Sequence, residues 1–187
     1  FNIKFSPGQK YILMIGTNNV KIWDVLSSQL LSTINIKMDN INDAEILGDE
    51  RTLVVTDASS LQYYDIYTGL LKKTISHKTA GIMSMHMLRH VPNTNYMLGV
   101  NKHGWHLPFL FHTNSGRLQG ALPIGNYQNI YDIQFSPDGK LMAVYSDKST
   151  NVLKWDNDLF SGKGNVILEI PYKKGEKIFH SAKKIAF

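Results

Sequence analysis

The amino-acid sequence predicts an all-β protein made of four repeated units, each with four short strands. Two observations support this: a turn motif that returns in the first and last units, and an aromatic–acidic pair that recurs at nearly even spacing. No stretch shows a sustained helical period of apolar residues, which excludes a helical repeat. A repeat of roughly 40 residues indicates an array of similar structural units.

The turn motif is the more specific of the two signals. Residues 3–11 read Ile-Lys-Phe-Ser-Pro-Gly-Gln-Lys-Tyr, and residues 133–141 read Ile-Gln-Phe-Ser-Pro-Asp-Gly-Lys-Leu. Phe135 lies 130 residues after Phe5, which is about 43 residues per unit if three units separate them. Pro presets φ and Gly tolerates positive φ, so each copy predicts a tight turn between two strands.

The second signal marks the third strand of each unit. Trp23-Asp24 returns as Tyr64-Asp65, weakly as Phe111-His112, and again as Trp155-Asp156, with steps of 41, 47 and 44 residues. We expect Trp23 and Trp155 to be structural, equivalent and largely buried. We expect Asp24, Asp65 and Asp156 to be structural turn residues, because an Asp side chain caps turn backbone.

The repeat fixes the expected strands and units. Short runs rich in β-branched and aromatic residues lie between turn formers. The expected strands are 3–5, 11–15, 20–23, 30–36, 52–56, 61–64, 70–75, 85–88, 96–100, 107–111, 117–122, 131–135, 141–145, 152–155 and 166–170. The expected units are 1–40, 41–80, 81–126 and 127–172, followed by a basic loop, 173–187, that leads into a further strand.

These motifs resemble those of the WD-repeat family, strongly in the first and fourth units and weakly in the third. The resemblance implies a β-propeller segment of about four four-stranded blades around a channel. It also implies a ring of about seven blades, the rest supplied by the same protein or a partner. The polar network of the family is patchy here: His77, Asp57 and Asp147 match it, whereas Asn18 and Asn19 replace the Asp of the first blade.

Composition narrows the class of protein. The chain has 187 residues, no cysteine and a net charge of +5. No apolar run approaches the roughly 20 residues that cross a bilayer, and no membrane partner is expected. The lack of cysteine excludes disulfides within this segment, and we expect a cytoplasmic or nuclear location.

No catalytic or cofactor-binding motif stands out. The sequence has no Gly-x-Ser-x-Gly elbow, no phosphate-binding glycine loop and no His-Glu-x-x-His. His86 and His90 are four residues apart, but the run around them reads as a strand rather than a metal-binding helix. We therefore expect no enzyme activity, no cofactor and no metal.

Aromatic and basic residues without a turn rationale gather in the loops that, in the resembling family, share one face of the ring. Such loops are better functional candidates than the Ser-Pro-Gly turns of the opposite face. The sequence predicts a mildly basic surface there for an acidic segment of a protein partner, with Trp105 and Tyr127 as anchors. The predicted partner-binding residues are Lys37, His77, Lys78, His103, Trp105, Tyr127 and Lys148.

The functional hypothesis is a non-enzymatic protein-interaction scaffold within a larger complex. One alternative is a degron receptor of a ubiquitin ligase. A second is a nucleic-acid or ribosome-assembly scaffold that uses its basic loops, including the lysines of the 173–187 tail. Salt dependence of binding separates the second alternative from the others.

Overall fold

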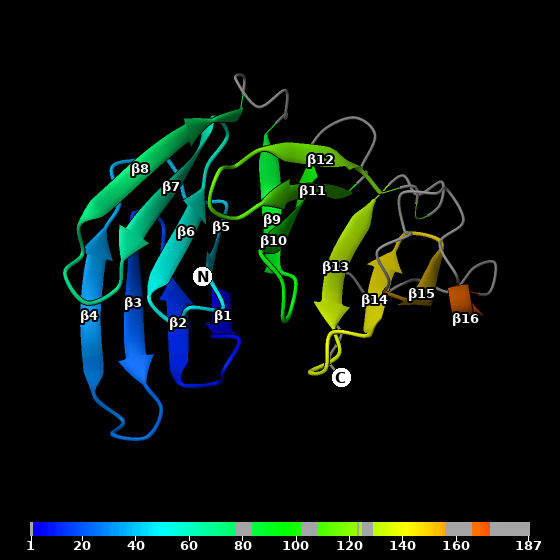
Figure 1. The fold of residues 1–187 in the computed structure, drawn as a ribbon, viewed down its shortest axis with the longest axis horizontal. Helices are drawn as coiled ribbons and strands as arrows, with labels where there is room; N and C mark the ends of the chain where they lie inside the picture. The colour runs from blue at the N-terminus through cyan, green and yellow to red at the C-terminus, as the bar shows by residue number, and fades with distance from the viewer. Residues whose placement is uncertain are drawn as a thin grey trace.

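The computed structural model describes residues 2–77, 84–101, 108–122, 124, 129–155 and 166–172, and these form four four-stranded antiparallel sheets (Figure 1). In each sheet the strands pair in chain order. The first sheet has β1 (Asn2–Phe5), β2 (Tyr11–Ile15), β3 (Asn19–Asp24) and β4 (Leu30–Asn35); the second has β5 (Asp43–Ile46), β6 (Thr52–Thr56), β7 (Ser60–Asp65) and β8 (Leu71–Ser76). The third has β9 (Met85–His90), β10 (Tyr96–Asn101), β11 (Pro108–His112) and β12 (Leu118–Ala121); the fourth has β13 (Ile130–Phe135), β14 (Leu141–Ser146), β15 (Ser149–Lys154) and β16 (Val166–Pro171).

The predicted all-β class is confirmed, and the arrangement is propeller-like. The first strands of the sheets lie toward the middle of the molecule, and β4, β8 and β16 lie toward its outside (Figure 1). The four sheets do not close a ring. One strand was not expected from the sequence: β5, with its two carboxylates in four residues.

Apolar side chains are buried between the sheets rather than within them. One cluster joins Leu13 and Ile22 of the first sheet to Leu53 and Val55 of the second. A second cluster lies between the second and third sheets, and a third lies between the third and fourth. Since a single sheet buries its apolar face only against another layer, each sheet depends on its neighbours for a core.

The burial pattern follows from this stacking. β2 alternates between buried and more exposed residues, because only one face of the first sheet has a neighbour. β6 is buried at all five positions, since the second sheet packs on both faces. Ile3 and Phe5 of β1 are each 58% exposed on the open side of the first sheet.

The inner strands are tied together by buried ion pairs. Lys4 Nζ of β1 lies 2.7 Å from Asp43 Oδ2 and 2.9 Å from Glu45 Oε2 of β5. Arg89 of β9 pairs with Asp43 at 3.2 Å and with Asp132 of β13. These five residues, the inner-strand network, link all four sheets, and the side chains of Lys4 and Arg89 are only 12% and 11% exposed.

Asp43 is the hub of the inner-strand network. Its Oδ2 also accepts a hydrogen bond from the Leu88 amide at 2.9 Å. Burial alone would raise the pKa of the Asp43 carboxyl, but the charges of Lys4 and Arg89 outweigh it and hold that pKa below its ordinary value. Asp43 is therefore ionised at neutral pH and compensated from both neighbouring sheets.

The two tryptophans of the repeat do not occupy equivalent positions, which corrects the sequence-based expectation. Trp23 pairs with Ile12 inside the β2–β3 ladder, whereas Trp155 follows the last residue of β15. The amide of Trp155 bonds to the Lys140 carbonyl, as the amide of Val25 bonds to Lys10 in the first sheet. Trp155 thus corresponds to Val25, because the fourth unit has two extra residues before its Trp-Asp pair.

Both tryptophans are partly buried rather than enclosed. Trp155 packs edge-on against Phe135, with ring centroids 5.1 Å apart, beside the cluster of the third and fourth sheets. The Nε1 of Trp23 is buried without a hydrogen-bond partner. Trp155 therefore contributes to the packing of the fourth sheet from a position outside its ladder.

Candidate functional site

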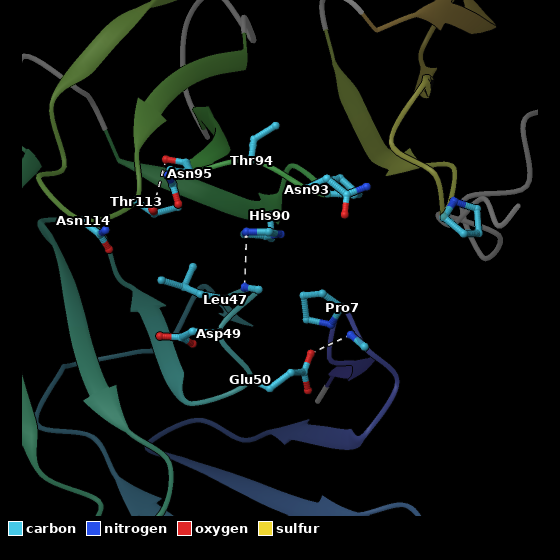
Figure 2. A pocket seen from close by; sticks show the side chains of 14 residues that line it. Pro7, Leu47, Asp49, Glu50, His90, Asn93, Thr94, Asn95, Thr113 and Asn114 are labelled. Atoms are coloured by element: carbon cyan, nitrogen blue, oxygen red, sulfur yellow. Dashed lines mark hydrogen bonds between the residues drawn. The ribbon is translucent and has the colours of Figure 1, made fainter.

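A pocket of about 590 Å³ opens at one end of the inner strands, where the turns of all four sheets meet (Figure 2). The turns between first and second strands supply residues 7–8, 47–50, 92–95 and 137. His90, at the end of β9, and residues 113–114 of the β11–β12 turn complete the wall. Four separate sheets thus build one pocket.

The backbone of these turns adopts an uncommon conformation. Gln9, Glu50 and Asn93 have φ of 58°, 51° and 60°, in the left-handed region that L residues avoid. Gln9 and Glu50 each cost about 1–2 kcal/mol relative to an ordinary conformation, whereas Asn93 belongs to a residue type that adopts this conformation more readily. Backbone strain of this kind clusters at functional sites, which makes this end of the strands a candidate.

Two carboxylates lie on the pocket wall, held by hydrogen bonds. Glu50 accepts a bond from Ser6 Oγ at 2.6 Å and one from the Gly8 amide at 2.6 Å, both in the first sheet. Asp49 accepts from the amides of Arg51 and Thr52 and from Thr52 Oγ1. Burial raises the pKa of the Asp49 carboxyl, but these hydrogen bonds lower it by more. The net shift of the pKa is downward, so the group is anionic at neutral pH.

His90 brings a buried imidazole to the wall between the two carboxylates and the third sheet. It is 8% exposed, and its Nε2 accepts a hydrogen bond from the Gly48 amide at 3.3 Å (Figure 2). The proton of the neutral ring is therefore assigned to Nδ1, which is buried with no hydrogen-bond partner. Burial lowers the pKa of His90, so the ring is neutral at pH 7.

The pocket is acidic although the chain is basic. Among the described residues, its lining has Asp49 and Glu50 but no lysine or arginine, against a net charge of +5 for the whole chain. The amide side chains of Asn95 and Asn114, both exposed, add neutral polar groups. The described residues contain no group of three or more His, Asp or Glu arranged to hold a metal ion.

The binding face predicted from the sequence lies at the opposite ends of the strands, and only part of it is described. Lys37, between β4 and β5, and Lys148, between β14 and β15, are exposed. His77 is 2% exposed; its Nε2 lies 3.3 Å from Thr56 Oγ1, and its amide bonds to the Ser59 carbonyl. His77 therefore joins two loops, and its side chain is covered. Lys78, His103, Trp105 and Tyr127 lie outside the described residues.

The recurring aspartates cap turns between third and fourth strands. Asp24 Oδ1 accepts from the amide and hydroxyl of Ser27, each at 2.8 Å. Asp65 Oδ1 accepts from the amides of Tyr67 and Thr68, and its Oδ2 lies 2.7 Å from Arg51 Nε. Asp156 lies outside the described residues.

Sequence reasoning passed over the pocket because its turns already had a structural explanation. The signal lay in departures from the repeat motif. The Ser-Pro-Gly and Ser-Pro-Asp-Gly turns of the first and fourth units become Leu47-Gly48-Asp49-Glu50 and Val91-Pro92-Asn93-Thr94 in the second and third. Those two turns, with His90, supply most of the polar groups of the pocket.

Comparison with solved structures places the chain among β folds of similar architecture. It is similar to the structure titled Kuenenia stuttgartiensis Hydrazine Synthase, with a TM-score of 0.63 and 15% sequence identity. The match covers 90% of this chain and 53% of that one, so this chain spans about half the length of that protein. At this identity the likeness shows the fold alone.

Sequence comparisons add no family. No family model matches the chain, and no curated protein matches it either. In the part of the chain that the structure describes, no helix has the length and apolar character needed to cross a membrane.

Proposed function

We propose that this chain is a non-enzymatic protein-interaction scaffold of the WD-repeat kind, and that a segment of its partner binds in the turn pocket. One observation carries the proposal: turns from four separate sheets converge on a single pocket. A pocket built this way exists only when the sheets are assembled. A partner that binds there therefore recognises only the folded array of sheets, as expected of a platform within a larger complex.

Rigid display is the proposed mechanism. Glu50 bonds the turn of the second sheet to that of the first, and the Gly48 amide bonds the second sheet to His90 of the third. Thr113 bonds to the Asn95 carbonyl through its amide at 2.8 Å, which fixes two turns of the third sheet to each other. Because these turns are ordered before a partner arrives, binding loses little loop entropy.

A site-specific photocrosslinker tests the proposal in the cells that make the protein. Benzoylphenylalanine is placed at Asn114, an exposed residue on the pocket wall whose side chain can be replaced without removing a cap. Matched positions are Lys148, on the face predicted from the sequence, and Thr33, exposed on the outer strand β4. Crosslinked proteins are then identified by mass spectrometry.

The expected result is a protein partner crosslinked from Asn114 at least several-fold more than from Thr33. Crosslinks from Lys148 alone would move the site to the opposite face. Crosslinks to RNA rather than protein would replace the proposal with the nucleic-acid alternative. Equal crosslinking from all three positions would overturn a defined binding site.

A further inference from the structure

We propose that two copies of this chain associate head to tail, so that the open face of the first sheet of each copy packs on the far face of the fourth sheet of the other. The far face is the one turned away from the third sheet. The first and fourth sheets are the two ends of the open array (Figure 1). The inference is independent of the turn pocket and goes beyond the proposed function.

The open face of the first sheet carries apolar side chains at positions that the other sheets bury. Ile3 of β1 pairs with Met14 of β2, and they are 58% and 42% exposed. The equivalent pairs of the second and fourth sheets are fully buried, each against the preceding sheet: Ala44 with Val55, and Ile133 with Val144. The open face therefore has the composition of a face that receives a preceding sheet.

A second row of apolar residues crosses the whole of this face. It consists of paired residues from all four strands: Phe5, Ile12, Trp23 and Leu30. Phe5 and Leu30, at the ends of the row, are exposed, and Leu26, in the turn after β3, is 97% exposed. A contiguous apolar surface of this kind marks an interaction site rather than a face in permanent contact with water.

The far face of the fourth sheet matches the face with which the first sheet packs on the second. Gln134 of β13 corresponds to Lys4, because each precedes the Phe of the Phe-Ser-Pro motif. Leu141 of β14 corresponds to Tyr11, because the carbonyl of each accepts a hydrogen bond from the Ser amide of that motif. Both Gln134 and Leu141 are partly exposed, since no further described sheet covers them.

A tyrosine cluster limits the open part of the far face. The ring centroid of Tyr145 lies 5.3 Å from that of Tyr131 and 6.2 Å from that of Tyr172, and Tyr145 is buried. Away from the cluster, Val152 of β15 pairs with Leu168 of β16, which is half exposed. The residues open to a second copy are therefore Gln134, Leu141, Val152 and Leu168.

The contact between Tyr11 and Tyr67 shows how the two ends match. Their hydroxyl oxygens lie 2.7 Å apart across the junction of the first and second sheets. At the junction of two copies, Leu141 takes the place of Tyr11. Leu26 takes the place of Tyr67, since Leu26 and Tyr67 each lie two residues after the Asp of the repeat. A pair of hydroxyls thus becomes a pair of aliphatic side chains, and the exposed Leu26 gains an apolar partner.

The inner strands of the two ends match in the same way. Lys4 forms an ion pair with Asp43 between the first and second sheets. At the junction of two copies, Gln134 takes the place of Lys4, and Asn2 takes the place of Asp43, its equivalent in the ladder. A pair of opposite charges becomes a pair of neutral amides, which donate and accept hydrogen bonds. Both ends therefore depart from the internal pattern together, as the two sides of one interface do.

The number of sheets sets the size of the assembly. A head-to-tail contact either closes a ring or continues as a filament. Two copies bring together eight sheets, four from each, which is the upper end of the range of about four to eight blades in β-propellers. The assembly is therefore a closed dimer. In dilute solution the copies separate, and the first sheet then has the open face described above.

Crosslinking between engineered cysteines tests the contact, because the chain has no cysteine of its own. Leu26→Cys and Leu141→Cys are made in two copies with different epitope tags, which are co-expressed and treated with a short bismaleimide. The matched control uses Leu70→Cys in place of Leu26→Cys, the same change at an exposed leucine of the turn between β7 and β8. Further controls combine each variant with itself.

We expect the Leu26→Cys and Leu141→Cys copies to crosslink several-fold more than the Leu70→Cys and Leu141→Cys copies. Leu26→Cys should not crosslink to itself, because a head-to-tail contact does not bring two first sheets together. Crosslinking of Leu26→Cys to itself, or a yield no higher than that of the Leu70→Cys control, would overturn the inference.

Sedimentation velocity tests the size of the assembly. The wild-type chain should be a dimer at about 0.1 mM. Leu26→Asp should raise the Kd of the dimer roughly tenfold, about 1.4 kcal/mol, because it places a charge in an apolar contact. Leu70→Asp should leave that Kd within about twofold. A wild-type monomer at this concentration, an assembly larger than a dimer, or equal effects of the two substitutions would reject the closed dimer.

Discussion

The first and second sheets have the same number of strands and the same pairing order, yet they differ in burial. The second sheet packs on both faces and is buried along the whole of β6, whereas the first has one open face with Ile3 and Phe5 exposed. The inner strand of the second sheet also supplies the hub of the inner-strand network, Asp43. The difference teaches that position in the array, together with strand sequence, decides how much each residue contributes to stability.

The largest difference in stability is expected between the variants Asp43→Ala and Asn2→Ala. The two residues occupy equivalent ladder positions, opposite Thr56 and Ile15, and each side chain accepts from the next amide along its strand. Asp43→Ala removes the hub and leaves Lys4 and Arg89 undercompensated, which should lower the free energy of unfolding by about 3–5 kcal/mol. Asn2→Ala should cost below about 1 kcal/mol. Equal losses in urea denaturation would contradict the hub role of Asp43.

A smaller effect is expected from Val55→Ala compared with Met14→Ala. Val55 of β6 and Met14 of β2 occupy equivalent ladder positions, and each points away from the next sheet along the chain. Val55 is fully buried against the first sheet, whereas Met14 has no sheet on that side and is 42% exposed. Val55→Ala should lower the free energy of unfolding by about 2–3 kcal/mol, because it leaves a cavity. Met14→Ala should change it by less than about 0.5 kcal/mol. Chemical denaturation measures both, and a large loss for Met14→Ala would mean that its face is covered in solution.

Acidification should weaken the second sheet more than the first. His77 and His90 each contact a residue of the second sheet, Thr56 and Gly48 respectively. Residues 1–35, which form the first sheet, contain no histidine. Burial lowers the folded-state pKa of both rings, against partial opposition from Asp57 for His77 and from Glu45, Asp49, Glu50 and the Thr94 backbone for His90. As the pH falls, both histidines are therefore protonated in the unfolded chain before they are protonated in the folded one. The free energy of unfolding is unaffected by these two rings above pH 6.5 and falls as the pH drops below that value.

Urea denaturation at pH 7.5 and pH 5.5 checks the expectation. The loss on acidification should be smaller than the effect of Val55→Ala, and the double variant His77→Gln, His90→Gln should reduce it. Met14→Ala in the first sheet should leave the pH dependence unchanged. An undiminished loss in the double histidine variant would assign the acid sensitivity to other groups.

The smallest effect concerns the turns between third and fourth strands. Ser28 in the first sheet and Gly69 in the second occupy the same turn position, with φ of 57° and 68°. Ser28→Gly should raise the melting temperature, with a gain of about 0.5–1 kcal/mol, since it relieves a left-handed conformation. Gly69→Ser should lower stability by about 1–2 kcal/mol through backbone strain alone, because no atom lies within 4 Å of its added Cβ. Changes of the same sign in both variants would contradict this account.

The sequence predicted the repeat and nearly all strands, because apolar periodicity and turn chemistry are local properties. It did not predict β5, since Asp43 and Glu45 become favourable in an inner strand only when Lys4 and Arg89 arrive from neighbouring sheets. The equivalence of Trp23 and Trp155 was wrong for a related reason: a motif shows that a Trp recurs but does not fix its ladder register.

The pocket was beyond sequence reasoning because no single turn contains it. Leu47, His90 and Asn114 are far apart in the chain and meet only through the stacking of sheets. The acidic character of the pocket was equally hidden, since the composition of the whole chain has the opposite sign. The face predicted from the sequence, with Lys37 and Lys148 exposed, stays a prediction.

The shared apolar clusters have a mechanical consequence. Because each cluster belongs to two sheets, the loss of one sheet also removes a shared apolar cluster from its neighbour. A force applied to the two ends of the chain would therefore extend it in discrete steps, each releasing roughly one repeat of chain. The step that separates the first and second sheets would also break the pairs of Lys4 with Asp43 and Glu45, so the array would resist tension unevenly along its length.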